Sequence, residues 1–312
     1  MALIGTGPLG RRGVTVTRLG LGCAPLGNLF ETVEEVDADA TVAAAWDAGI
    51  RYFDTAPLYG LGLSEERVGR ALRGRPRDEF VLSTKVGRLI ENEPGADPGI
   101  FAVAPGRVAT FDYSRDAVLR SIDASLGRLG LDRIDVVLVH DPDDHEQEAI
   151  DHAFPTLIEL RDQGVIRAVG SGMNQAAMLQ RFVARVDLDA VLLAGRWTLL
   201  DRSGAGLLDL CEARGVGVIL GGVFNSGLLA DPDGATTFDY APAPDDLRRR
   251  ARDLRDRAAV HGVSLTGAAL AFGRRHPAVA TTVVGARSAA EVEQNVAAWR
   301  QEPPPACWDE LG

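Results

Sequence analysis

The sequence FVLSTKVG, residues Phe80–Gly87, decides how the rest of the chain is interpreted. Its apolar run ends in Lys85, which is the single lysine among the 33 lysine and arginine residues of the protein. Such a run predicts a buried strand of a parallel sheet, and the carboxyl ends of such strands carry the chemistry of α/β sheets and barrels. An ammonium group also has a pKa that neighbours can shift, unlike a guanidinium. We therefore interpret Lys85 as a functional residue; the alternative is a surface lysine present by chance.

Outward from this stretch, strand patterns and helix patterns alternate along the chain. Short apolar runs, most of them rich in Val, Ile and Leu, predict strands at residues 17–22, 51–56, 80–85, 134–140, 166–172, 189–195, 216–222 and 280–286. Apolar periodicity and capping residues predict helices at 36–47, 64–73 with Ser64 as N-cap, from 114 onward, and at 148–163, 175–185, 207–214, 245–276 and 289–300. Eight strand–helix units predict an α/β fold, a (β/α)8 TIM barrel forming a single domain over residues 1–312. A doubly wound sheet is the alternative, but no GxGxxG motif follows a strand and opens a helix.

Three segments fall outside the repeat. Residues 8–16 predict an N-terminal β-hairpin around a glycine turn. The segments Arg88–Tyr113 and Ser226–Pro244 follow the third and seventh strands and are long and rich in Gly, Pro and Asp. Because both leave the carboxyl end of a strand, we expect long loops at the C-terminal face of the barrel and interpret them as candidate lids.

Composition narrows the class of partner. With 312 residues, of which 46% are hydrophobic, the chain can bury a large core, and its net charge of -11 argues against nucleic acid or an anionic membrane as a partner. The three cysteines, Cys23, Cys211 and Cys307, show no CxxC spacing, so neither a disulfide framework nor a zinc site is indicated. No apolar run approaches the ~18 residues of a membrane span, and no signal peptide is evident. We expect a cytoplasmic protein that acts on a small molecule and binds no metal.

Four polar residues are expected to meet at the mouth of such a barrel. Asp54 ends the second strand, Tyr59 follows in its loop, Lys85 ends the third strand and His140 ends the fourth. Each has a structural explanation on its own: a turn cap for Asp54, a half-buried loop aromatic for Tyr59, a core histidine for His140. Their joint placement on adjacent strands favours a catalytic site instead.

The chemistry of this set can be argued from the side chains. A phenol is a poor base near neutral pH, but an ammonium group close to it favours the phenolate and lowers its pKa. We expect Lys85 to supply that charge, Asp54 to hold the lysine in place and His140 to orient the substrate oxygen. The site would pass one proton to or from an oxygen on carbon, and the accompanying hydride requires a cofactor.

On these motifs the sequence resembles the aldo-keto reductases. YFDTAPLYG carries the family's Asp and Tyr, LSTKVG its Lys and DVVLVHDPD its His, and the likeness runs from PLGRRGVTVTRLGLGCAPLGN to VVGARSAAEVEQN. The resemblance implies a single barrel, an extended nicotinamide cofactor across the mouth, no metal, and hydride transfer at a carbonyl carbon. It assigns the catalytic tetrad to Asp54, Tyr59, Lys85 and His140.

The same resemblance implies a set of cofactor-binding residues. An aromatic ring against the nicotinamide falls on Trp197 and the pyrophosphate loop on Phe224, Asn225, Ser226, Gly227 and Leu228. The adenosine segment falls on Gly285, Arg287, Glu291, Gln294 and Asn295. The family's Ser-Asn pair for the carboxamide is replaced by GSGMN, which leaves Ser171, Asn174 and the backbone as alternatives.

The adenosine segment bears on the choice between NAD and NADP. Glu291 stands where phosphate-binding relatives have an arginine, and Gly285 where many have a lysine. A carboxylate would repel a 2′-phosphate and could accept a hydrogen bond from the ribose hydroxyl, so we expect NAD rather than NADP, with Arg287 as the argument for NADP.

Within the family, TRLGLGCAPLGNLF, TFDYS and GSGMNQ resemble the aldose 1-dehydrogenases that oxidise L-fucose and related sugars. This implies oxidation of an anomeric hydroxyl to a lactone, with the Arg88–Tyr113 segment expected to supply polar partners for the sugar. A pyridoxal dehydrogenase or a general aldehyde reductase remains an alternative. More distant alternatives are a Schiff-base lyase that uses Lys85 and a non-catalytic subunit that binds nicotinamide. The oligomeric state is left open.

Overall fold

The computed structural model describes residues 4–234, 237–239 and 241–312. Within this part, eight parallel strands close into a barrel with the order β10-β11-β14-β3-β4-β5-β8-β9, as the sequence predicted. The strands are β3 Leu19–Gly22, β4 Tyr52–Asp54, β5 Val81–Val86, β8 Val136–His140, β9 Ala168–Met173, β10 Ala190–Ala194, β11 Gly217–Gly221 and β14 Val279–Gly285. Nearly all their residues are buried, because helices cover the outer face and side chains fill the interior.

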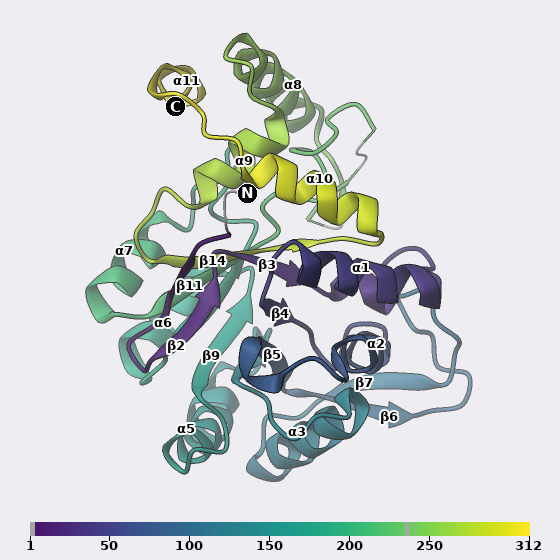
Figure 1. Ribbon diagram of the computed structural model, residues 1–312. Coiled ribbons are helices and arrows are strands. Elements are labelled where there is room, and N and C mark those ends of the chain that lie inside the picture. Colours follow the sequence, from purple (N-terminus) through teal and green to yellow (C-terminus); the bar gives the residue numbers. More distant parts are fainter. Residues whose placement is uncertain (1–3, 235–236, 240) are drawn as a thin grey trace.

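Each barrel strand is followed by a helix of the outer ring (Figure 1). These helices are α1 Glu35–Asp47, α2 Leu63–Leu72, α3 Arg115–Leu129, α5 Phe154–Asp162, α6 Ala176–Arg185, α7 Ala205–Arg214, α9 Leu265–Gly273 and α10 Ala289–Trp299. Two further helices, α8 Asp245–Val260 and α11 Pro305–Leu311, pack against each other outside the ring. The apolar faces of the ring helices and the outer faces of the strands together form the main core.

Three helix predictions need correction. The single helix expected over 245–276 is two helices, because the chain turns at Gly262 with φ +70° and the Ser264 hydroxyl caps α9. The helix expected over 148–163 starts as α4 Glu146–Glu148, passes through a π-helical turn, Ala149–Ala153, and continues as α5. Ser64 is not the N-cap of α2: its hydroxyl donates to the Cys23 carbonyl at 2.7 Å and lies 2.8 Å from Thr55 Oγ1, so it ties the helix to the strand ends.

The predicted N-terminal hairpin is present and closes the bottom of the barrel. Strands β1 Thr6–Leu9 and β2 Val14–Thr17 pair antiparallel. In the turn between them, Gly10 has φ +70° and packs so closely on Asp189 that an added Cβ would lie 2.2 Å from its carbonyl oxygen. Glycine is therefore required at this contact.

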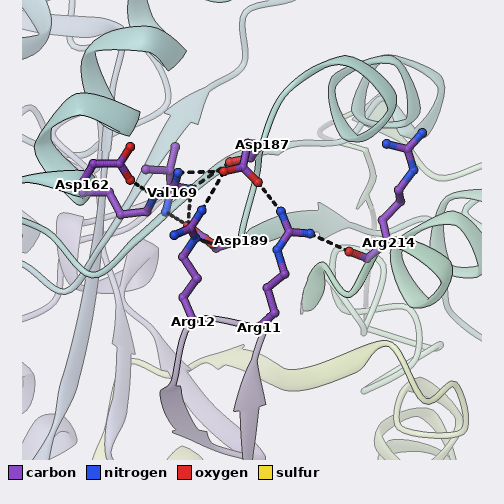
Figure 2. Close-up of polar contacts among 8 residues, drawn as sticks. Arg11, Arg12, Asp162, Val169, Asp187, Asp189 and Arg214 are labelled. Carbon is purple, nitrogen blue, oxygen red and sulfur yellow. Dashed lines mark hydrogen bonds and ion pairs between the residues drawn. The ribbon is translucent and has the colours of Figure 1, made fainter.

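A network of ion pairs fastens the hairpin turn to the barrel (Figure 2). Arg12 reaches Asp187 at 2.8 Å and Asp189 at 3.2 Å, while Arg11 pairs with Asp187 and donates to the Arg214 carbonyl. The buried Asp189 also accepts from Arg161 at 3.0 Å and from the Val169 amide at 2.9 Å. Because the charges and backbone groups of this network are paired with one another, we interpret the N-terminal face of the barrel as a structural end, distinct from the opposite end where the strands finish.

The two long segments lie at the opposite end, as predicted. The first forms a ribbon of β6 Arg88–Asn92 and β7 Arg107–Phe111 beside α3 (Figure 1), and its Phe101 bridges Leu29 in the loop after β3. The second contains the short pair β12 Thr237–Phe238 and β13 Ala241–Pro242; its residues 235–236 and 240 lie outside the described part. Both segments therefore border the mouth of the barrel.

Candidate active site

Three adjacent strands deliver the expected catalytic side chains to one place. Asp54 ends β4, Lys85 lies near the end of β5 and His140 ends β8. Lys85 Nζ donates to Asp54 Oδ2 at 2.8 Å and to the Thr55 carbonyl at 2.9 Å, and only 1% of the lysine is exposed. The lone lysine is thus a buried, paired cation rather than a surface charge.

Tyr59 and His140 complete the cluster. The loop after β4 turns tightly, with Gly60 packed on Gly27 of the β3–α1 connection, and brings Tyr59 back over the strand ends. Lys85 Nζ lies 4.7 Å from the centre of the Tyr59 ring, and the rings of Tyr59 and His140 meet edge to face with centres 5.8 Å apart. The structure therefore brings all four predicted residues together.

A hydrogen-bonded chain inside the barrel supports Asp54. The Tyr52 hydroxyl donates to Ser83 Oγ at 2.9 Å, and Ser83 Oγ donates to Asp54 Oδ1 at 2.7 Å. Both carboxylate oxygens of Asp54 are therefore satisfied, one by Ser83 and one by Lys85. No sequence pattern marks Tyr52 and Ser83 as part of the site, apart from their places on predicted strands.

Burial and charge set the protonation of the site. Burial alone would lower the pKa of Lys85, but the neighbouring Asp54 and Tyr59 raise it overall, so the lysine is cationic. Burial raises the pKa of Tyr59 to about 12, although the Lys85 charge acts in the opposite direction. The expected lowering by Lys85 is present, but burial has the larger effect on the phenol pKa. Burial, Lys85 and Arg88 hold the pKa of His140 well below its usual range, so its imidazole is neutral.

A cavity of about 130 Å³ opens above these residues and is bordered by Tyr59, Lys85 and His140. Its walls are mostly apolar: Leu29, Leu58, Ile100, Phe101, Met173 and Leu192. The Arg88–Tyr113 segment was expected to contribute polar partners, but the residues it places in this wall are Ile100 and Phe101. The reason is that the segment folds back on the loop after β3, through bonds from the Phe30 amide to the Ile100 carbonyl and from the Ala102 amide to the Asn28 carbonyl.

A groove of about 390 Å³ adjoins this cavity and shares Leu29, Asn174 and Ala194 with it. Eight of the predicted cofactor residues line the groove: Asn174, Phe224, Asn225, Ser226, Gly227, Gly285, Arg287 and Glu291. Asn174 stands where groove and cavity meet, whereas Ser171 is fully buried and donates to the Val139 carbonyl at 3.0 Å. Of the two side chains left open for the carboxamide, the placement favours Asn174.

The groove has features that fit an anionic dinucleotide. Asn225, Ser226 and Gly227 form a tight turn with consecutive left-handed φ values of +47°, +57° and +97°, and the amides of Asn225 and Gly227 donate within it to the Gly222 and Phe224 carbonyls. Asn225 is 3% exposed, and its Oδ1 has no partner among the described residues. At Gly285 an added Cβ would lie 2.8 Å from the Pro25 ring, so the groove depends on the absence of a side chain there. These residues and the Arg287 cation fit an anionic dinucleotide, with Asn225–Gly227 the segment predicted to hold its pyrophosphate.

Five predicted cofactor residues do not line the groove. Besides Ser171, these are Leu228, which is buried, Gln294, which is exposed, Asn295, which donates to the Gly285 carbonyl, and Trp197. The Trp197 ring packs on Phe272 of α9, with ring centres 5.0 Å apart, and edge-on to His276. Its ring therefore contributes to the outer core in this structure.

Several residues near the groove were missed from the sequence. Glu31 pairs with Arg287, which Glu291 also contacts at 3.3 Å, so two carboxylates flank this cation. Arg67 is buried and donates to Leu26, Asn28 and Val33, and so braces the loop after β3. These contacts join residues far apart in the sequence, and no local pattern marks them.

Comparisons with known proteins agree with this geometry. The family model described as the aldo/keto reductase family matches residues 18–310. The chain belongs to this family. It is 43% identical to pyridoxal 4-dehydrogenase of Microbacterium luteolum, over 97% of this chain and 95% of the relative, and 41% identical to D-threo-aldose 1-dehydrogenase of a Pseudomonas species, over 96% and 94%. Among solved structures, the holo form of aldo-keto reductase AKR11C1 from Bacillus halodurans has a TM-score of 0.78 and 28% identity, over 99% of this chain and 96% of that one.

Membership confirms the predicted family, fold and enzyme class: the protein is an oxidoreductase with an aldo/keto reductase barrel, and the family uses nicotinamide cofactors. Within the described residues, no helix has both the length and the apolar content to cross a membrane. In the same part of the chain, no cluster of three or more His, Cys, Asp or Glu side chains is arranged to hold a metal ion.

Proposed function

We propose that this aldo/keto reductase is an NAD-dependent dehydrogenase that oxidises the anomeric hydroxyl of an aldose to a lactone. The observation that carries the proposal is the joining of the two cavities: the phenol of Tyr59, beside the buried Lys85–Asp54 pair, borders a cavity that adjoins the dinucleotide groove. Both relatives are named as dehydrogenases, which supports oxidation as the direction of the reaction.

The residues supply the proton chemistry. A bound nicotinamide in its oxidised form accepts a hydride and carries a positive charge. In the reaction, the C–H bond at the anomeric carbon breaks with both electrons leaving as the hydride, while the hydroxyl proton passes to Tyr59 Oη and the remaining O–H electrons form the lactone C=O bond. Neutral His140 donates a hydrogen bond to the same oxygen. Tyr59 acts as the base in its phenolate form, which the neighbouring Lys85 charge favours.

The preference for NAD follows from the adenosine end of the groove. Among the described residues that line it, Arg287 is the cationic side chain, and it is flanked by Glu31 and Glu291. A 2′-phosphate would have to displace these carboxylates and then lie close to them, which like charges oppose. A ribose 2′-hydroxyl, in contrast, can donate to a carboxylate.

A second candidate substrate is pyridoxal. The apolar cavity walls, including Phe101 and Leu58, suit a flat aromatic ring better than they suit a fully hydroxylated sugar. The relative named pyridoxal 4-dehydrogenase supports this candidate to the same degree as the aldose dehydrogenase supports the first.

The deciding experiment measures initial rates with NAD and NADP against a panel of aldoses, pyridoxal and simple aldehydes. We expect the highest kcat/KM with NAD and an aldose; faster turnover of pyridoxal or reduction of simple aldehydes alone would contradict the proposal. Tyr59→Phe should lose turnover and keep NAD binding, because it removes the proton acceptor and leaves the ring in place. Full activity of that variant, or substrate trapped on Lys85 by borohydride, would refute the assigned roles.

A further inference from the structure

The residue after the catalytic histidine has an unusual conformation. Asp141 has φ +40°, which is rare for a residue with a side chain, and its carboxylate lies in the wall of the cavity that Tyr59 and His140 border. Asp141 Oδ2 is 3.5 Å from His140 Nε2. A strained backbone that turns a carboxylate toward reacting groups is a functional hypothesis in itself.

The backbone of Asp141 is fixed without help from its side chain. Its amide donates to the Gly172 carbonyl at 3.1 Å, and the Tyr113 hydroxyl donates to the carbonyls of both Asp141 and His140, at 3.0 and 2.7 Å. The carboxylate itself contacts Arg88 Nη2 at 3.1 Å, and the Arg88 guanidinium stacks on Phe111 at 4.4 Å. Arg88 therefore holds Oδ2, the same oxygen that lies 3.5 Å from His140 Nε2, and a carboxylate can accept further hydrogen bonds beyond the one from the arginine.

The proposed function already assigns roles to the other polar side chains of the cavity. In the described part of its wall, the polar side chains are Tyr59, Lys85, His140, Asp141 and Asn174. Under the proposed function, the first three act on the reacting oxygen and Asn174 faces the cofactor side. Asp141 is left as the side chain that can recognise a further hydroxyl, against walls that are otherwise apolar.

We propose that Asp141 determines substrate specificity by accepting a hydrogen bond from the hydroxyl on the carbon next to the anomeric carbon of the aldose. The inference rests on the proposed function and deepens it. Under the proposed function, His140 donates a hydrogen bond to the reacting oxygen through Nε2. A hydroxyl on the adjacent carbon lies about one hydrogen-bond length, ~2.8 Å, from that oxygen. With its carboxylate 3.5 Å from the same nitrogen, Asp141 is within reach of that hydroxyl. A site built to bind a hydroxyl rejects the analogue that lacks it, because its own polar group is then buried without a partner.

The test compares an aldose with its 2-deoxy analogue in the wild type, Asp141→Ala and Asp141→Asn. For the wild type we expect kcat/KM to be roughly 10–100 times higher with the 2-hydroxy sugar, the effect of a hydrogen bond to a charged group. In Asp141→Ala this ratio should approach one, mainly through a higher KM for the 2-hydroxy sugar. Asp141→Asn, which keeps an uncharged acceptor, should give an intermediate ratio.

Tyr113→Phe is the matched structural control. It removes the hydroxyl that holds the His140 and Asp141 carbonyls, so it should lower kcat/KM for both sugars alike and preserve their ratio. If Asp141→Ala also preserved the ratio, its role would be positional and the inference would be overturned while the proposed function stood. A wild type that oxidised no aldose would overturn both.

Discussion

Replacing Lys85 with methionine isolates the electrostatic effect of the lone lysine on the phenol. The substitution keeps a long apolar stem and removes a positive charge 4.7 Å from the centre of the Tyr59 ring. At an effective dielectric constant of about 20, a unit charge at this distance stabilises a phenolate by about 3.5 kcal/mol, equivalent to about 2.6 pKa units. Below the phenol pKa, the phenolate should therefore be roughly 400-fold scarcer at any given pH.

A matched double variant separates this effect from the loss of the ion pair. In Lys85→Met alone, the carboxylate of Asp54 stays buried without its cation and repels a phenolate. In Lys85→Met with Asp54→Asn, both charges are absent, so the phenol loses an attraction and a repulsion together. We expect kcat/KM for oxidation to fall in the order wild type, double variant, Lys85→Met.

The assay is the initial rate of NADH formation as a function of pH at saturating NAD. Oxidation needs the phenolate, so the rate should rise about tenfold per pH unit below the phenol pKa and level off above it. Since loss of Lys85 raises that pKa, the plateau should move to higher pH in the single variant and less far in the double variant. NAD affinity, followed by quenching of tryptophan fluorescence, controls for damage to the groove. Superimposable pH profiles in all three proteins would refute the electrostatic role of Lys85.

Two other parts of the molecule give independent predictions. The double variant Glu31→Gln, Glu291→Gln should free the Arg287 guanidinium and lower the KM for NADP at least about tenfold, because the carboxylates that repel a 2′-phosphate are gone. The measurement is the initial rate with NAD and with NADP. An unaltered ratio of kcat/KM between the two cofactors would contradict the role assigned to these carboxylates. Asp189→Asn should lower the free energy of unfolding by about 3 kcal/mol in urea denaturation, because it removes the fully buried carboxylate partner of Arg161 and leaves this buried guanidinium only the more exposed Asp162 and Asp187. The exposed Asp78, paired with Arg133, is the control: Asp78→Asn should cost less than about 1 kcal/mol, and equal losses would show that burial does not matter here.

The barrel was predictable because its strands are local patterns. Short apolar runs mark all eight: seven contain Val, Ile or Leu, and β4 has Tyr52 and Phe53. Gly215, which follows a predicted helix, has the left-handed φ expected at a C-cap. The helix at 245–276 was misread because arginines and aspartates continue a helical pattern up to Val260, and only residues 261–264 separate α8 from α9. Ser64 was misread because a serine before a glutamate pair looks like a cap, whereas its partners, Cys23 and Thr55, are set by the tertiary fold.

Part of the site was predictable from topology. In a barrel, the carboxyl ends of neighbouring strands must converge, so the positions of Asp54, Lys85 and His140 on successive predicted strands were enough to group them. That argument does not predict the direction in which each side chain points. Trp197 follows a strand end like the others, but its ring turns outward onto Phe272. The sequence also could not predict whether the pKa of Tyr59 is raised or lowered overall, because this depends on how completely the phenol is buried.

The two ends of the barrel use buried cations differently. At the N-terminal end, Arg161 is buried and spreads its guanidinium over Asp187 and Asp189, a fork that binds several acceptors and fixes loops. At the other end, an arginine in place of Lys85 would extend a longer, planar group into the space between Asp54 and Tyr59, where a single charge has to satisfy one carboxylate and act on one phenol. A buried ion pair contributes little net stability relative to apolar packing, so stability does not account for the pair. We propose instead that the pair is present for its compact charge: the lysine lies 4.7 Å from the centre of the phenol ring, close enough to favour the ionised form of Tyr59, and it is small enough to leave the adjoining cavity open.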